Sequence, residues 1–184
     1  MQYAQDHEGF VHRGIPFGPP PWYVDYIPYL GETDNGDNRP YKVYRCPSHA
    51  NKQATITYVI NGWDFATEDP HAQPDGMIEV VSPTPLANFS KPAETIYFAD
   101  MEDGPEVPDV RSADFSLNAV RMDVFEPLQL PSSPNDAYGG NLGRRVPPDR
   151  HGQGHNAVYA DGHAGFVSGN LTEEEYIKMW MNRR

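Results

Sequence analysis

The stretch that decides the fold is "RHGQGHNAVYADGHAGFV", residues 150–167. Two short segments within it, "NAVYA" (156–160) and "HAGFV" (163–167), contain the valine, tyrosine and phenylalanine that strands favour. Between them stands Asp161-Gly162, a preferred two-residue hairpin turn in which both central residues need positive φ. The stretch therefore predicts an antiparallel hairpin with Asp161 and Gly162 at its tip.

The register of this hairpin would separate the polar residues around it. A two-residue turn places Ala160 opposite His163 and Asn156 opposite Val167. The tip and the far end of the hairpin are then about 17–20 Å apart, because each strand residue advances the chain by roughly 3.3 Å. Side chains from both ends cannot reach one metal ion unless the loop before the hairpin folds back along the strand.

Two interpretations of the polar residues follow. The first is a metal or catalytic cluster of His151, His155, Asp161 and His163. The second is structural, with Asp161 shaping the turn while Arg150 and His151 form hydrogen bonds to nearby loops or carboxylates. The spacing favours the structural interpretation, in which His151 and Asp161 do not ligate one metal ion and no residue is assigned a catalytic role.

Further strands are predicted upstream of the hairpin. The clearest is "ETIYFAD" (94–100), whose residues alternate between two faces. "ATITYVIN" (54–61) alternates β-branched and polar residues, and "YKVYRCP" (41–47) is a shorter candidate strand. Residues 101–149 are acidic, rich in proline and weakly periodic, which predicts a long loop with one short element near 115–125.

Helices are predicted towards both ends of the chain. "MQYAQDHEG" (1–9) is typical of the last turns of a helix that stops at a glycine, and "WYVDYIPYL" (22–30) predicts a short aromatic helix or turn. "LTEEEYIKMWMNRR" (171–184) begins with a capping box of Thr172 and Glu175. Its expected buried stripe consists of Tyr176, Ile177 and Trp180. The whole chain of 184 residues therefore predicts one α+β domain, with an antiparallel sheet, long loops and a C-terminal helix.

Composition limits the class of partner. The formal net charge of −12 argues against nucleic acid, because binding to phosphates needs a basic surface. The single cysteine, Cys46, gives no disulfide framework and no zinc site built from several cysteines. No apolar run reaches about 18 residues, so nothing in the sequence as given predicts a transmembrane helix.

Two other groups of residues are weak candidates for binding. The acidic segments 33–38 and 100–104 offer oxygen ligands of the kind that calcium prefers. The four carboxylates concerned are Asp34, Asp37, Asp100 and Asp103, although neither segment fits an EF-hand. Asp100 also has two alternatives of its own, a strand-end carboxylate or a catalytic acid. The aromatic segment 19–30 predicts either core anchors or a platform for sugar rings.

Several segments together resemble one protein family. His151, nine residues and Asp161-Gly162 fit the C-terminal signature of the bacterial prepilin-type processing-associated H-X9-DG proteins, which are related to type II secretion pseudopilins. The likeness runs from the first residues to about 168, apart from 101–149. Five more segments carry it in order: "QYAQDHEGF" (2–10), "WYVDYIPYLG" (22–31), "YRCPSH" (44–49), "TYVINGW" (57–63) and "SKPAETIYFAD" (90–100).

The resemblance implies a pilin-like structural subunit rather than an enzyme. Members carry a prepilin peptidase motif and a long apolar helix, so we expect an apolar segment of about 20 residues upstream of Gln2. That helix would anchor the parent in the inner membrane and bind other pilin-like subunits and the secretion machinery, with the domain in the periplasm or on an extracellular fibre. The domain alone is then expected to be monomeric. A carbohydrate- or ligand-binding module on a pilin anchor is the first alternative, and a metal-dependent hydrolase centred on His151, His155 and Asp100 is the second.

The resemblance also bears on bound ions and on Cys46. It implies no cofactor, with calcium as the one ion that related pseudopilins hold in acidic loops. Members often pair the cysteine of the "CPS" segment with a second cysteine in the N-terminal helix. With one cysteine in the sequence, we expect Cys46 to be an unpaired thiol. The alternative is a small buried apolar residue, a frequent role of cysteine.

Overall fold

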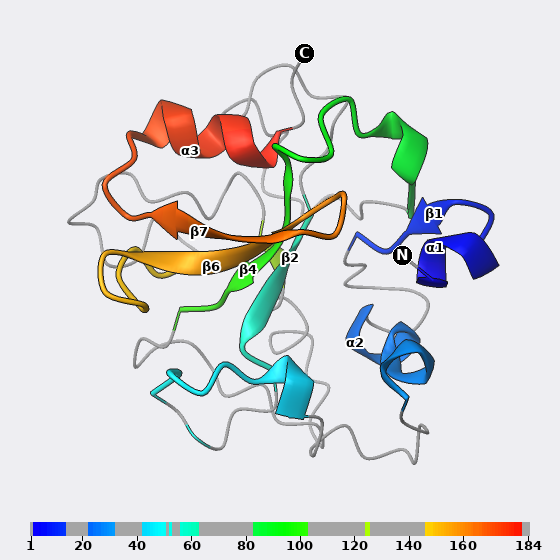
Figure 1. Cartoon of the computed structure of the whole chain (residues 1–184), viewed down its shortest axis with the longest axis horizontal. Coiled ribbons are helices and arrows are strands. Elements are labelled where there is room, and N and C mark those ends of the chain that lie inside the picture. The colour runs from blue at the N-terminus through cyan, green and yellow to red at the C-terminus, as the bar shows by residue number, and fades with distance from the viewer. Residues whose placement is uncertain are drawn as a thin grey trace, which may run out of the picture.

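The computed structural model describes residues 2–13, 22–31, 42–50, 52, 56–62, 83–102, 124–125 and 146–181. Helices and strands are mixed along the chain, with η marking 3₁₀ helices (Figure 1). Their order is α1 (Gln2–Asp6), β1 (Phe10–Val11), α2 (Trp22–Asp25), η1 (Ile27–Leu30), η2 (Lys42–Tyr44), β2 (Tyr58–Asn61), β3 (Thr84–Pro85), η3 (Leu86–Asn88), β4 (Ile96–Asp100), β5 (Val124–Phe125), β6 (Gly154–Tyr159), β7 (Ala164–Ser168) and α3 (Glu173–Trp180). The predicted α+β class is confirmed.

The main sheet has five strands in the order β5-β2-β4-β6-β7. Strands β2, β4, β6 and β7 are antiparallel to their neighbours, but β5 runs parallel to β2. The expectation of a purely antiparallel sheet is therefore wrong at this edge. The reason is topological: β5 follows β4, runs opposite to it and pairs on the far side of β2. A second, two-stranded sheet joins β1 to β3.

The β6–β7 hairpin forms as predicted, but its register differs by one residue. Asn156 pairs with Phe166 instead of Val167, and the Tyr159 N–H donates to the His163 carbonyl at 2.9 Å. The loop therefore has three residues, not two, and of the two expected turn residues only Gly162 has a positive φ, 95°.

A type I turn followed by one left-handed residue accounts for this hairpin geometry. Its three-residue loop also bonds to the chain before β4. The Ala160 N–H donates to the Thr95 carbonyl at 2.9 Å, and the Asp161 N–H donates to the Pro92 carbonyl at 3.2 Å. In the predicted two-residue turn Ala160 pairs with His163, so it is not a loop residue whose N–H can bond to the Thr95 carbonyl.

Helical elements cover both faces of the sheet. On one face α3 packs over the central strands, where the Asn61 side-chain amide donates to the Trp180 carbonyl at 2.9 Å (Figure 1). On the other face the Trp22 ring of α2 lies 5.0 Å from the Phe98 ring of β4. Trp22 and Trp180 are both almost fully buried, so the sheet is the middle layer of the core.

The predicted helix signals are confirmed where the structure describes them. The side chain of Thr172 caps α3 together with Glu175, and Ile177 and Trp180 are buried while Tyr176 is partly buried. The chain leaves α1 through a turn that ends at Gly9, where φ is 84°. Both results follow from local chemistry, a capping box and a left-handed glycine.

The strand predicted at 41–47 is wrong. Residues 42–44 form the 3₁₀ helix η2, and the Arg45 N–H closes a turn onto the Lys42 carbonyl at 3.1 Å. The following backbone donor, the Cys46 N–H, donates to the Thr57 hydroxyl rather than to a strand partner. Pro47 has no N–H to extend a ladder.

The long segment expected at 101–149 is described only in part. Strand β5 lies within the predicted short element at 115–125. Residues 103–123 and 126–145 lie outside the described part of the chain. Among the helices described, none has both the length and the apolar character needed to cross a bilayer.

Candidate functional site

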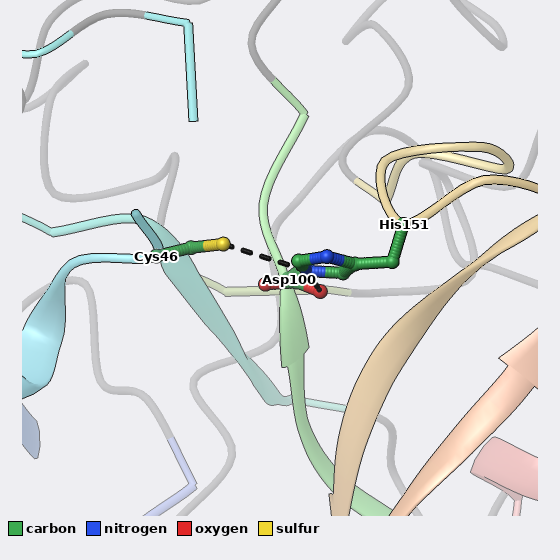
Figure 2. Close-up of side chains that lie close together, drawn as sticks. All are labelled: Cys46, Asp100 and His151. Carbon is green, nitrogen blue, oxygen red and sulfur yellow. Dashed lines mark hydrogen bonds and ion pairs between the residues drawn. The ribbon is translucent and has the colours of Figure 1, made fainter. Parts of the chain in front are cut away.

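Three potential ligand side chains meet at one end of the sheet: Cys46, Asp100 and His151 (Figure 2). Cys46 follows η2, Asp100 ends β4, and His151 lies in the turn before β6. The Nε2 atom of His151 is 3.1 Å from Asp100 Oδ2 and 3.5 Å from Cys46 Sγ. All three ligand atoms lie within 4.8 Å of one another. A thiol, an imidazole and a carboxylate thus face one point in space.

The β4–β6 pairing positions Asp100. Its side chain is 1% exposed, and the backbone N–H of Asn156 donates to Oδ2 at 2.8 Å. The other oxygen, Oδ1, is buried and accepts no hydrogen bond from the residues that the structure describes. Burying a charged oxygen without a hydrogen-bond partner is energetically costly.

A tight turn positions His151. Its N–H donates to the Gly154 carbonyl at 2.9 Å, and the Gly152 N–H donates to the Asp149 carbonyl at 3.2 Å. Gly152 has a φ of 95°, a conformation that glycine adopts without the strain of a side chain. The His151 side chain remains 24% exposed, which gives the cluster access to solvent.

Backbone hydrogen bonds fix Cys46. Its N–H donates to the Thr57 hydroxyl at 2.5 Å, and its carbonyl accepts from the His49 N–H at 3.1 Å. Burial raises the pKa of the Cys46 thiol, the backbone N–H of Ser48 partly offsets this rise, and the negative charge of Asp100 adds to it. The thiol is therefore protonated at neutral pH, as expected of the small buried residue that was one prediction for Cys46.

Two neighbouring residues, Arg150 and Tyr58, also interact electrostatically with this cluster. The guanidinium of Arg150 donates through Nη2 to the Met101 carbonyl and counteracts the rise in the pKa of both Cys46 and Tyr58. Burial raises the pKa of Tyr58 to about 12, with further increases from Cys46 and Asp100. The predicted bonding of Arg150 and His151 to a loop and a carboxylate is thus confirmed.

The geometry distinguishes a catalytic Cys-His-Asp relay from a set of metal ligands. In a catalytic Cys-His-Asp relay the histidine uses one ring nitrogen for the thiol and the other for the carboxylate. Here the single Nε2 atom of His151 faces both groups. A protonated thiol is also a poor nucleophile. A sulfur, a nitrogen and an oxygen directed at one point instead form a donor set that a metal ion could use.

The other residues predicted for the hairpin lie elsewhere. Asp161 Oδ1 is 2.6 Å from His163 Nδ1, at the exposed tip beyond the opposite end of β6 from His151. His155 is buried against α3, with its ring 5.8 Å from the Tyr176 ring. Burial lowers the pKa of His155 to about 4. The structure therefore does not assemble the four-residue cluster considered from the sequence.

Of the four weak calcium candidates, the structure describes only Asp100. Asp34, Asp37 and Asp103 lie outside the described residues. Asp100 belongs to the cluster with Cys46 and His151, whose sulfur and nitrogen donors suit softer ions than calcium.

A cavity of about 700 Å³ lies between the sheet and the N-terminal helices. Aromatic side chains dominate its walls: Tyr3, Trp22, Tyr26, Tyr29, Tyr44, Tyr58, Phe89, Tyr97, Phe98 and Tyr159. Two of their hydroxyls are already engaged, since the Tyr26 and Tyr97 oxygens are 2.6 Å apart and the Tyr97 hydroxyl donates to the His12 carbonyl at 2.5 Å. The cavity is therefore more apolar than its tyrosine content indicates.

Sequence reasoning missed the link between Cys46 and the other two residues. It treated Cys46 as a solitary thiol and grouped Asp100 and His151 only in the hydrolase alternative, together with His155. The available signals were the carboxylate at the end of the clearest strand and a histidine in a glycine-rich turn. Cys46 and His151 are 105 residues apart in the sequence, and neither signal indicates that they are in contact.

No protein-family model, no curated protein and no solved structure matches the chain.

Proposed function

We propose that this chain is the globular domain of a pilin-like structural subunit of a type II secretion-like or type IV pilus-like assembly. An apolar helix upstream of α1 anchors the parent protein in the inner membrane, and the domain is displayed in the periplasm or on a fibre. Its partners are other pilin-like subunits and the secretion machinery, engaged through that helix. The proposal assigns the domain no catalytic step.

One observation carries the proposal: the six segments that resemble the H-X9-DG proteins pack against one another as a single core. The Tyr44 hydroxyl donates to the Tyr23 carbonyl at 2.6 Å, which joins the second and third segments. Trp22 contacts Phe98, joining the second to the fifth, and the strands β2, β4 and β6 join the last three. The segments that carry the resemblance therefore belong to one domain, as the proposal requires.

The cluster at the end of the sheet is compatible with a subunit that performs no catalysis. The Cys46 thiol has a raised pKa, and one nitrogen of His151 faces both of its neighbours. Both features disfavour a nucleophilic mechanism. An exposed domain without chemistry needs only a stable core and a soluble surface, which the net charge of −12 supplies.

The test is localisation and processing in the bacterium that makes the protein. A C-terminal epitope tag on the full reading frame is followed in membrane and soluble fractions, with and without the prepilin peptidase. We expect a membrane-bound product that becomes larger when the peptidase is deleted, because the leader is retained. A product that is released by a cleavable secretory signal and is unaffected by the peptidase would contradict the proposal.

The aromatic cavity favours a second candidate, a ligand-binding module on the same anchor. Its volume of about 700 Å³ is within the range of small-molecule sites, and Trp22 forms part of its wall. The engaged hydroxyls of Tyr26 and Tyr97 favour an apolar or aromatic ligand over a sugar. Quenching of tryptophan fluorescence by an apolar dye, compared with oligosaccharides, distinguishes the two, and a Trp22→Phe variant tests whether Trp22 reports the binding.

A further inference from the structure

We propose that Cys46, Asp100 and His151 bind a divalent transition-metal ion, with zinc as the ion that best fits the three donors. Tetrahedral zinc binds nitrogen and oxygen at about 2.0 Å and sulfur at about 2.3 Å, which separates the N and S donors by about 3.5 Å and the N and O donors by about 3.3 Å. The corresponding separations here are 3.5 Å from His151 Nε2 to Cys46 Sγ and 3.1 Å from Nε2 to Asp100 Oδ2. These two separations match those of ligands to one ion, and the ligand atoms of Cys46 and Asp100 lie within 4.8 Å of each other.

A second and independent observation is the buried carboxylate. Asp100 Oδ1 accepts no hydrogen bond from the described residues, although Asp100 is 1% exposed. The Asn156 N–H holds Oδ2, as neighbouring donors commonly orient metal-binding carboxylates. A cation beside this carboxylate would compensate its buried charge.

The charges of the ligands balance those of the ion. A thiolate from Cys46 and the carboxylate of Asp100 carry two negative charges, which neutralise a divalent cation and suit a mostly buried site. The thiol proton leaves to solvent as the sulfur–metal bond forms. Three protein ligands leave a fourth tetrahedral position for water or an exchangeable ligand. The partly exposed ring of His151 marks the route by which the ion enters.

The experiment is a Co²⁺ titration of the metal-free chain of residues 1–184, followed by absorbance. Tetrahedral Co²⁺ with one thiolate ligand gives visible d–d bands and a near-ultraviolet sulfur-to-cobalt band, and we expect saturation at one ion per chain. Zn²⁺ should then displace Co²⁺ and bleach both bands. Cys46→Ser should abolish the sulfur band, and Asp100→Asn or His151→Gln should weaken affinity about tenfold or more, as even the loss of a supporting group does.

The chain supplies its own matched control. His163 and Asp161 form a second His–Asp pair on the exposed hairpin tip, 2.6 Å apart and outside the cluster of Cys46, Asp100 and His151. His163→Gln should leave both bands and the affinity unchanged. Near-ultraviolet circular dichroism verifies that each variant folds, and if Cys46→Ser does not, His151→Gln carries the test.

Three outcomes would overturn the site. They are no saturable band with folded wild-type protein, a sulfur band that persists in folded Cys46→Ser, and an equal loss of affinity in His163→Gln. These results are separate from those of the fractionation experiment, because metal binding by the isolated domain does not depend on the anchor or on its processing.

Discussion

His155 shows how one buried residue makes stability depend on pH. It lies on β6 beneath α3 and is 2% exposed. Burial lowers its pKa from 6.5 to about 4, with a smaller contribution in the same direction from His151 and Arg150 and an opposing one from Asp100. The folded protein therefore holds this ring neutral at pH values where the unfolded chain protonates it.

We expect this histidine to weaken the fold on acidification. Between pH 6.5 and 4 the unfolded chain binds the additional proton, so the stability present above pH 6.5 falls as the pH drops, by roughly 3 kcal/mol in total. His155→Phe keeps the ring and removes the proton. Urea unfolding across this range should show a shallower pH dependence for His155→Phe than for the wild type. An unchanged dependence in His155→Phe would contradict the assignment.

At the scale of single residues, the sequence allowed part of the site to be predicted. The bonding of Arg150 and His151 to a loop and a carboxylate follows from polar side chains beside a hairpin end. Asp100 was among the candidate carboxylates, grouped with His151 and His155 in the hydrolase alternative, but its contact with His151 depends on the β4–β6 pairing, which the sequence did not specify. Cys46 comes from a third segment of the chain, where its backbone N–H donates to the Thr57 hydroxyl.

At the scale of elements, the sequence predicted features that depend on neighbouring residues, such as a helix cap, but it did not determine the register of the paired strands. The capping box of α3 is a contact between residues three apart, so the sequence contains all of it. The hairpin register depends instead on where the loop can bond, and bonds to Thr95 and Pro92 outside the hairpin accompany the three-residue loop. Segment 41–47 has strand-like composition, yet its backbone bonds to Thr57, which composition cannot indicate.

The close approach of β6 and β7 gives a test of the hairpin. A Cβ atom at Gly154 would lie 2.1 Å from the Val167 carbonyl oxygen and 2.5 Å from Cζ of Phe166. Gly154→Ala should therefore force the strands apart and lower the free energy of unfolding by about 2–3 kcal/mol. Asn156→Ala, exposed on the same strand and retaining its backbone donor, should change it by less than about 0.5 kcal/mol. Chemical unfolding measures both, and equal values would refute this packing.

At the scale of the whole molecule, the charge of −12 governs association. Like charges repel as two copies approach, and the repulsion is screened only beyond about 8 Å at physiological salt. We expect the isolated domain to be monomeric in multi-angle light scattering at neutral pH. A concentration-independent dimer under these conditions would place assembly in this domain rather than in an upstream helix.

The order of strands in the sheet has a consequence for synthesis of the protein. Strand β4 is central, but its partner β6 is translated more than fifty residues later, an interval of roughly 3–12 s at ribosomal rates of about 5–20 residues per second. Throughout this interval the edge of β4 that pairs with β6 has no partner. Nascent chains stalled before β6 should therefore depend on chaperones that release the chain once the C-terminal hairpin has emerged.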